Sequence, residues 1–131
     1  NKWNLMHDKS VEVIVEGLLS IGLLKGTKEE IIERGDYSKF YMHRIGHWLG
    51  MDVHDVGSYK QDGDWRELEK GMVMTVEPGI YILDSIEGID DKWKGIGVRI
   101  EDDIAITDSG FEILTPDVPR TIEEVEQTVQ G

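Results

Sequence analysis

Three of the four histidines of this chain lie in one short stretch, His43–Gly57. They are His43, His47 and His54, and three glycines are interleaved with them. Glycine permits sharp turns and close approach of the backbone, which makes a continuous helix unfavourable here. Imidazole is the side chain best suited to binding a metal or moving a proton near neutral pH. The stretch therefore predicts irregular backbone, with a short strand or a turn of helix, around a functional site.

The composition excludes several classes of function. The chain has 131 residues, which suits one domain with a real core. Its formal net charge of -13 would repel phosphate backbones, so nucleic acid is not an expected partner. It has no cysteine, which excludes disulfides and thiolate sites and fits a reducing compartment, so we expect a cytoplasmic protein. The longest apolar run, Leu18–Leu24, is too short to span a membrane.

The start of the chain indicates a piece of a longer protein. No basic segment precedes an apolar one, so no secretion signal is predicted. The first residue is Asn1 rather than methionine, and it leads directly into a helical pattern.

Two helices are predicted ahead of the histidines. Apolar residues within positions 1–25 recur at helical spacing, and Gly26 is placed to end this helix. These residues are Val11, Ile14, Val15, Leu18 and Leu19. His7 has no partner in the sequence and is expected on the surface. Thr27 followed by Glu30 is a capping-box pattern, which opens a short second helix that Gly35 ends.

Short strands are predicted after the histidines. Residues 58–71 are polar and predict a surface loop. Residues 72–82 are rich in β-formers, and Pro78-Gly79 divides them into two short strands or one kinked strand. Residues 84–95 predict a second polar loop, which Trp93 anchors. Residues 111–114 predict a short strand, and Thr121 caps a final helix through Val129.

The clearest strand is predicted at residues 97–107, where apolar and polar side chains alternate. Arg99, Glu101 and Asp103 point to one face. The other face carries Val98, Ile100, Ile104 and Ile106. The order of elements predicts an α+β fold, in which helices pack on the outer face of a curved antiparallel sheet. The polar side chains would then lie on the inner face.

Several kinds of metal site are compatible with these residues. His43 and His47 have the spacing of the zinc motif HExxH, but Arg44 stands where that motif needs glutamate. Three histidines alone could bind zinc if the stretch folds back on itself. Glu77 lies in an otherwise apolar strand, where a carboxylate is costly unless it is paired, coordinated or turned to solvent. Glu101 alone fits an ordinary solvated face. One histidine with several carboxylates favours manganese or another hard divalent ion.

Three longer segments together resemble one known family. They are MHRIGHWLGMDVHDVG, GMVMTVEPGIYI and GIGVRIEDDIAIT. In this order and spacing they are similar to the catalytic motifs of Xaa-Pro aminopeptidase (aminopeptidase P). That family belongs to the pita-bread metallopeptidases, with methionine aminopeptidase, prolidase and creatinase. The phrase RIEDD separates the chain from methionine aminopeptidase, and HWLG favours aminopeptidase P over prolidase.

The resemblance implies a set of metal ligands. His47 matches the metal-binding histidine of the family. Glu77 matches a glutamate that binds one metal and is placed to handle a proton. Glu101 matches the glutamate that bridges two metal ions. The cofactor implied is a pair of Mn²⁺ ions in the full-length enzyme, although other divalent metals are compatible.

The resemblance also implies catalytic roles for residues that bind no metal. His43 and His54 match two histidines that contact the substrate and stabilise the charge of the tetrahedral intermediate. Arg99 matches an arginine that supports the metal site from behind the ligands. Glu77 belongs to this catalytic group as well, because it matches a glutamate that is placed to handle a proton.

One part of the family site is missing from the chain. The family uses two further aspartates that lie upstream, and the only aspartates before His43 are Asp8 and Asp36, in different contexts. Residues 1–131 therefore resemble the C-terminal half of a pita-bread catalytic domain. Alone, this half is expected to be inactive or nearly so. It should also expose apolar surface, which predicts a homo-oligomer or aggregation.

The function implied is removal of an N-terminal residue that precedes proline, through a water activated by two metal ions. The substrates would be peptides with proline at the second position. Prolidase, which cleaves Xaa-Pro dipeptides, is an alternative within the same class. A pita-bread protein that has lost its metal and acts as a binding module is another. The presence of all three ligands expected in this half, His47, Glu77 and Glu101, disfavours the binding module.

Overall fold

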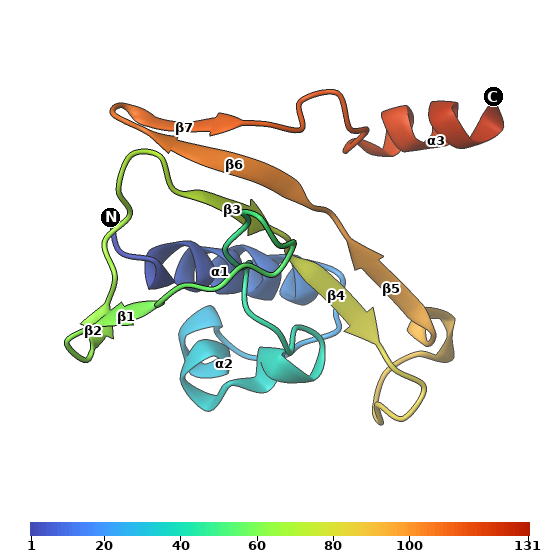
Figure 1. Cartoon of the computed structure of the whole chain (residues 1–131). Helices are drawn as coiled ribbons and strands as arrows, with labels where there is room; N and C mark the ends of the chain where they lie inside the picture. The colour runs from blue at the N-terminus through green and yellow to red at the C-terminus, as the bar shows by residue number, and fades with distance from the viewer.

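The molecule consists of a bent antiparallel sheet with the helices α1 and α2 on one side of it. The computed structural model describes residues 1–131, and Figure 1 shows α1 and α2 lying beside the strands. The helices are α1 (Asn4–Ser20), α2 (Lys28–Arg34), α3 (Ile122–Gln130) and the 3-10 helices η1 (Asp36–Lys39) and η2 (Asp91–Trp93). The strands are β1 (Lys60–Gln61), β2 (Asp64–Trp65), β3 (Val73–Val76), β4 (Gly79–Ile82), β5 (Ile96–Arg99), β6 (Asp102–Thr107) and β7 (Gly110–Ile113). None of the helices has both the length and the hydrophobicity needed to cross a bilayer.

The first helix is shorter than its sequence pattern predicts. α1 ends at Ser20, so the prediction of a helix through residue 25 that Gly26 ends was wrong. Gly22 takes a left-handed conformation (φ 77°), which turns the chain back. Leu23 and Leu24 are then only 6% and 5% exposed. These two leucines reach the core only because the chain turns here, since a continued helix would carry both side chains beyond the core.

Side-chain caps define the start of the other two helices. Thr27 and Glu30 form the predicted capping box at the start of α2, and each side chain accepts a backbone N–H of the other residue. Gly35 ends α2 in the left-handed conformation. Thr121 caps α3 as predicted, and Glu124 completes a second capping box there. These boundaries are local, so the sequence was sufficient to place them.

The sheet is made of two antiparallel ladders that continue one another. β6 lies between β3 and β7, and β4 pairs with β5. β3 leads into β4 and β5 leads into β6, so the ladders form one bent ribbon (Figure 1). The two strands predicted at residues 72–82 are confirmed. The single strand predicted at residues 97–107 was wrong, because it divides into β5 and β6. Pro78 has no N–H to continue the ladder, which accounts for a break at this point of both strands.

The two ladders keep the same register across this break. The flanking pairs are Val76–Asp102 and Gly79–Arg99. Continuing this register places Glu77 directly opposite Glu101. Opposed residues of an antiparallel pair point to the same face, so both carboxylates share one side of the ribbon.

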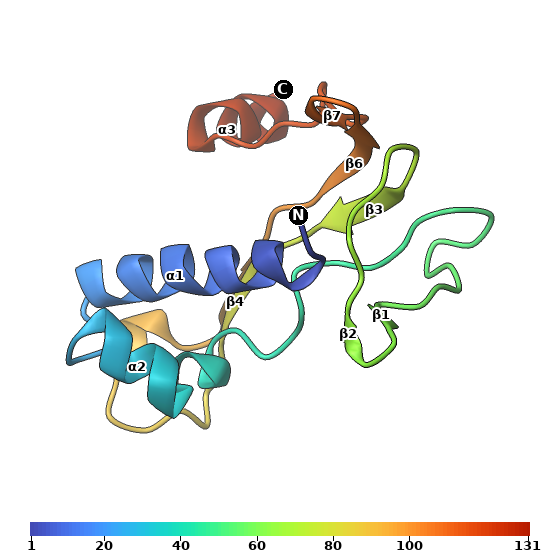
Figure 2. The same cartoon turned by 90° about the vertical axis from the view of Figure 1, so that its left-hand side faces the viewer.

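The hydrophobic core lies on the opposite side of the ribbon from these carboxylates. Its larger cluster joins α1 and α2 to Phe40, Tyr41 and Ile82, and a smaller cluster contains Trp3, Trp48, Met74 and Ile104. Even-numbered residues of β3, β4 and β6 supply the contacts to the helices. Figure 2 shows α1 and α2 together on that side, whereas α3 lies apart from them. Helices on the face opposite the carboxylates agree with the predicted arrangement.

The segment predicted as a polar loop at residues 58–71 contains a small hairpin. β1 and β2 pair across a two-residue turn, Asp62-Gly63, in which both residues have positive φ (52° and 85°). An Asp-Gly dipeptide is a standard signal for this type of hairpin turn, so the sequence did contain the information. Residues 84–95 form a loop as predicted, apart from the 3-10 helix η2 within it, and Trp93 is half-buried against the larger cluster.

Candidate metal site

The histidine-rich stretch lies along the free edge of β3. Three backbone hydrogen bonds connect them: Leu49 N to Val73 O (3.1 Å), Thr75 N to His47 O (3.0 Å) and Glu77 N to Ile45 O (2.7 Å). The stretch thus adds a partial strand to β3, with one β-bridge between Trp48 and Met74. Irregular backbone with a short extended portion was the predicted structure.

A glycine makes this close approach sterically feasible. A Cβ atom on Gly46 would lie 1.9 Å from the carbonyl oxygen of Thr75 and 2.8 Å from its carbonyl carbon. No side chain fits in that space, so any other residue would push the stretch away from β3. The glycine therefore determines how near His47 comes to the carboxylates of the ribbon.

The three predicted metal ligands come together at the break in the sheet. Donor atoms of His47, Glu77 and Glu101 all lie within 4.8 Å of one another. Glu77 is buried, with 7% exposure, His47 is half-buried and Glu101 is exposed. The solvent-facing alternative for Glu77 is therefore excluded. The cluster contains no other carboxylate and no aspartate.

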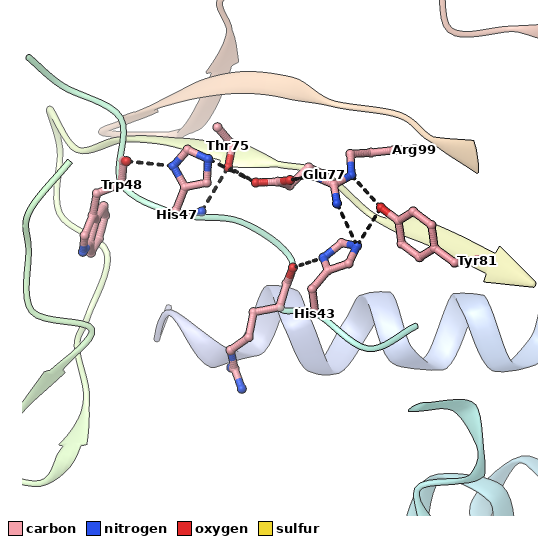
Figure 3. A network of polar contacts seen from close by, with 8 residues as sticks. His43, His47, Trp48, Thr75, Glu77, Tyr81 and Arg99 are labelled. Atoms are coloured by element: carbon pink, nitrogen blue, oxygen red, sulfur yellow. Dashed lines mark hydrogen bonds and ion pairs between the residues drawn. The ribbon is translucent and has the colours of Figure 1, made fainter. Parts of the chain in front are cut away.

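Hydrogen bonds orient the His47 ring toward this cluster. Its Nδ1 lies 2.9 Å from the carbonyl oxygen of Trp48, and a carbonyl can only accept, so Nδ1 carries the proton. This tautomer leaves the Nε2 lone pair free for a cation. Nε2 lies 3.2 Å from Glu77 Oε1 (Figure 3). Such a contact is favourable when Nε2 is protonated or when both atoms bind one cation.

Two neighbours hold the buried carboxylate of Glu77. The Thr75 hydroxyl donates to Oε1 at 2.9 Å, and Arg99 Nη1 donates to Oε2 at 2.6 Å. Figure 3 shows the carboxylate between Arg99 on one side and Thr75 and His47 on the other. A hydrogen bond to Tyr81, together with the charge of Glu77, raises the pKa of the Arg99 guanidinium. Arg99 is therefore a permanent cation in contact with Glu77.

A second set of contacts joins His43 to this group. His43 Nδ1 donates to the Arg44 carbonyl at 2.7 Å, which leaves Nε2 to accept from the Tyr81 hydroxyl at 3.2 Å. Arg99 Nε in turn donates to the Tyr81 oxygen at 2.7 Å. The ring of His54 packs edge-on against His47, with centroids 4.3 Å apart. Both predicted catalytic histidines thus lie beside the cluster, one on each flank.

Sequence reasoning missed two residues of this network, Thr75 and Tyr81. Both have the same strand parity as Glu77, two residues before it and four after it. The period of two in a β-strand therefore contained a signal for them. Polar side chains on the same face as a suspected ligand could have been included on that ground.

His7 is not the isolated surface histidine that the sequence predicted. Its ring is half-buried, with its centroid 5.6 Å from that of Tyr41 and its Nδ1 3.5 Å from the Tyr41 hydroxyl. Burial, with a smaller contribution from the charge of Arg44, lowers the pKa of His7. The Tyr41 ring also contacts His43, at 5.1 Å between centroids. The prediction failed because α1 packs its first turns over a segment far along the chain.

The chemistry of these donors fits a hard divalent cation. One imidazole nitrogen and two carboxylates make an oxygen-rich set, which suits manganese and similar ions better than a structural zinc site. Two glutamates placed opposite one another repel each other, and a cation between them would remove that repulsion. The residues present therefore fit a metal centre, of which they form one side.

Comparisons with known proteins identify the family that this chain resembles. The model of metallopeptidase family M24 matches residues 3–108. The Xaa-Pro aminopeptidase of Haemophilus influenzae is 51% identical over 120 residues, which are 92% of this chain and 27% of that protein. The human Xaa-Pro dipeptidase is 37% identical over an alignment of 157 positions, which covers 98% of this chain and 32% of that protein.

Solved structures extend the agreement to the fold. The chain superimposes on the aminopeptidase PepP of Pseudomonas aeruginosa with a TM-score of 0.95 and 54% identity. The match covers 98% of this chain and 29% of that one. The fold is therefore that of part of a pita-bread aminopeptidase, as the resemblance implied. The chain spans roughly a quarter to a third of the length of the relatives that it matches.

Proposed function

Because the chain belongs to metallopeptidase family M24, we propose that it forms part of an enzyme that removes an N-terminal residue preceding proline. The single observation that carries the proposal is the convergence of His47, Glu77 and Glu101 within 4.8 Å at the break in the sheet. The similarity to Xaa-Pro aminopeptidases gives the substrate class, which is peptides with proline at the second position.

We assign the metal to these three residues. His47 through Nε2, and Glu77 and Glu101 through their carboxylates, would hold divalent cations, for which Mn²⁺ is our choice because of the oxygen-rich donor set. When bound, two such ions would polarise the scissile carbonyl and lower the pKa of a water molecule. Glu101, which is exposed and lies opposite Glu77, would supply the third of these ligands.

The other polar residues would act directly on the substrate or on the ligands. The Glu77 carboxylate, held by Thr75 and Arg99, is placed to accept a proton as water attacks and to pass it to the leaving amine. His43 and His54 flank the cluster and could donate hydrogen bonds to the oxygen that becomes negative. Arg99 would hold the Glu77 carboxylate in one orientation.

We further propose that residues 1–131 are the C-terminal half of the catalytic domain. The chain spans 27% of its Haemophilus influenzae relative, and its cluster contains three ligands and no aspartate. Two aspartates from a preceding segment would complete a two-metal site. The isolated chain should then be inactive or nearly so, with at most weak metal binding.

Prolidase activity is the second candidate. It is favoured by the 37% identity to the human Xaa-Pro dipeptidase over almost the whole chain. The two enzymes differ in substrate length, so the longer protein containing this chain should be assayed with an Xaa-Pro dipeptide and with a longer Xaa-Pro peptide. Preference for the longer peptide, with loss of activity on chelation, supports the aminopeptidase. Cleavage of the dipeptide alone would replace it with prolidase.

The metal assignment has its own test on this chain. Mn²⁺ binding should be measured by isothermal titration calorimetry for the wild type, His47→Ala, Glu101→Ala and the control Glu112→Ala, which alters an exposed glutamate on β7. Binding that both site variants abolish and the control retains supports a preformed half-site. Binding that survives both site variants would place the metal elsewhere and contradict the assignment.

A further inference from the structure

One buried hydroxyl joins the two ligand-bearing segments. Thr75 is 1% exposed, and its Oγ1 accepts the backbone N–H of His47 at 3.0 Å. The same oxygen donates its proton to Glu77 Oε1 at 2.9 Å. A backbone N–H only donates and a carboxylate only accepts, so one hydroxyl satisfies both groups and its own orientation is fixed.

This contact adds a side-chain link between two segments that backbone hydrogen bonds already pair. His47 lies on irregular backbone, 28 residues before Thr75, whereas Glu77 follows the end of β3. Figure 3 shows the hydroxyl between the His47 backbone and the Glu77 carboxylate. The absence of a side chain on Gly46, whose Cβ would lie 3.0 Å from Thr75 Oγ1, allows the approach. Two separate features of the sequence thus serve the same contact.

We propose that Thr75 is a positioning residue that sets the separation of His47 and Glu77. The inference rests on the proposed function only in taking these two residues as metal ligands. Thr75 would touch neither metal nor substrate and would act through its two partners. Valine has nearly the same shape but no hydroxyl, so Thr75→Val would leave a buried N–H without its acceptor and a carboxylate oxygen without its donor.

The test begins with the metal-free chain. Hydrogen exchange of the His47 amide should be about tenfold faster in Thr75→Val than in the wild type, because one hydrogen bond is lost. The Leu49 amide lies on the same stretch as His47 but bonds to Val73 O, so its exchange rate should be unchanged. Thr75→Ser keeps the hydroxyl and should exchange like the wild type. Thr107→Val makes the same change at the end of β6, away from the site, and should have no effect.

Metal affinity gives the second readout. The dissociation constant for Mn²⁺ should rise roughly tenfold to a hundredfold in Thr75→Val, the range typical for residues that orient metal ligands. Thr75→Ser should restore it and Thr107→Val should not change it. If the wild-type chain itself binds no Mn²⁺, that result counts against a preformed half-site, and the exchange measurement still decides the inference about Thr75.

A measurement on the wild type covers the case in which Thr75→Val does not fold. The Thr75 hydroxyl proton should exchange slowly enough to appear in the NMR spectrum, with a cross-peak to the His47 amide. A hydroxyl in fast exchange without that cross-peak would overturn the proposal. So would equal His47 exchange in wild type and Thr75→Val, or loosening of His47 and Leu49 together. None of these outcomes depends on whether the metal assignment is correct.

Discussion

Glu77 and Glu101 face each other across the break in the bent ribbon, each with a donor atom within 4.8 Å of the other and of His47. The register on both sides of the break places them directly opposite. Like charges in this position destabilise an antiparallel pair. A fold that keeps two opposed carboxylates, one of them buried, tolerates a cost in stability that a bound cation would remove. This relationship makes several properties of the chain measurable.

Replacing one carboxylate should change stability and metal binding in opposite directions. Without metal, Glu101→Gln should raise the free energy of unfolding by about 0.5 kcal/mol, because the repulsion with Glu77 is removed. Urea unfolding in the presence of a chelator measures this. In saturating Mn²⁺ the order should reverse, because the wild type gains stability from the ligand that it binds better. Glu112→Gln, on β7, should change neither. A variant less stable than the wild type in both conditions would contradict the opposed-charge account.

Two glycine substitutions should have opposite effects on stability. Gly46→Ala places a methyl group 1.9 Å from the Thr75 carbonyl oxygen, so it should destabilise the fold by about 1–3 kcal/mol and displace His47. Gly17→Ala, inside α1 with open space around it, should stabilise by about 0.5–1 kcal/mol. Thermal or urea unfolding of both variants tests the pair. A neutral Gly46→Ala would show that the stretch does not lie as close to β3 as described.

The stabilising contact between Asp102 on β6 and Arg120 in the C-terminal segment should depend on pH. Hydrogen bonds from Arg120 lower the pKa of Asp102. Because the folded pKa lies below the unfolded value of about 3.9, the stabilisation is complete above that pH and is lost as pH falls through the folded pKa. The wild type should therefore exceed Asp102→Asn in unfolding free energy at pH 7. The difference should shrink below about pH 4. A difference that stays constant down to pH 2 would disprove this link.

The uncovered apolar face should drive self-association. Side chains on the face of the sheet that α1 covers only in part remain exposed, namely Ile96, Val98, Ile100, Phe111 and Ile113. Light scattering after gel filtration should show a mass that rises with concentration. The double variant Val98→Lys/Phe111→Lys should shift the chain toward monomer. Val53→Lys changes another exposed valine, in the histidine-rich stretch, and should not cause this shift. A monomeric wild type at all concentrations would contradict the expectation.

Features that depend on a few neighbouring residues could be predicted from the sequence. The capping box of Thr27 and Glu30 and the helix that begins after Thr121 follow from local hydrogen bonds. The shared face of Arg99 and Glu101 follows from the period of two in an extended chain. The motifs that contain the candidate ligands were also recognisable, because the residue types that such chemistry needs are few.

Features that depend on contacts between distant segments could not be predicted in this way. The end of α1 is set by the burial of Leu23 and Leu24 in the core, and the position of His7 by Tyr41, 34 residues later. No local pattern contains either fact. The division of residues 97–107 into two strands is likewise caused by the partner strand, because Pro78 has no N–H to continue the ladder.

By itself, then, the sequence determined which residues were candidates for the site, because the motifs that resemble the family and the parity of the strands are properties of the local sequence. Only the tertiary structure decided that Glu77 is buried and held by Thr75 and Arg99, since burial depends on what packs against a strand rather than on the strand itself. The donor atoms of His47, Glu77 and Glu101 meet because three separate segments pair side by side, and that pairing is a property of the whole fold.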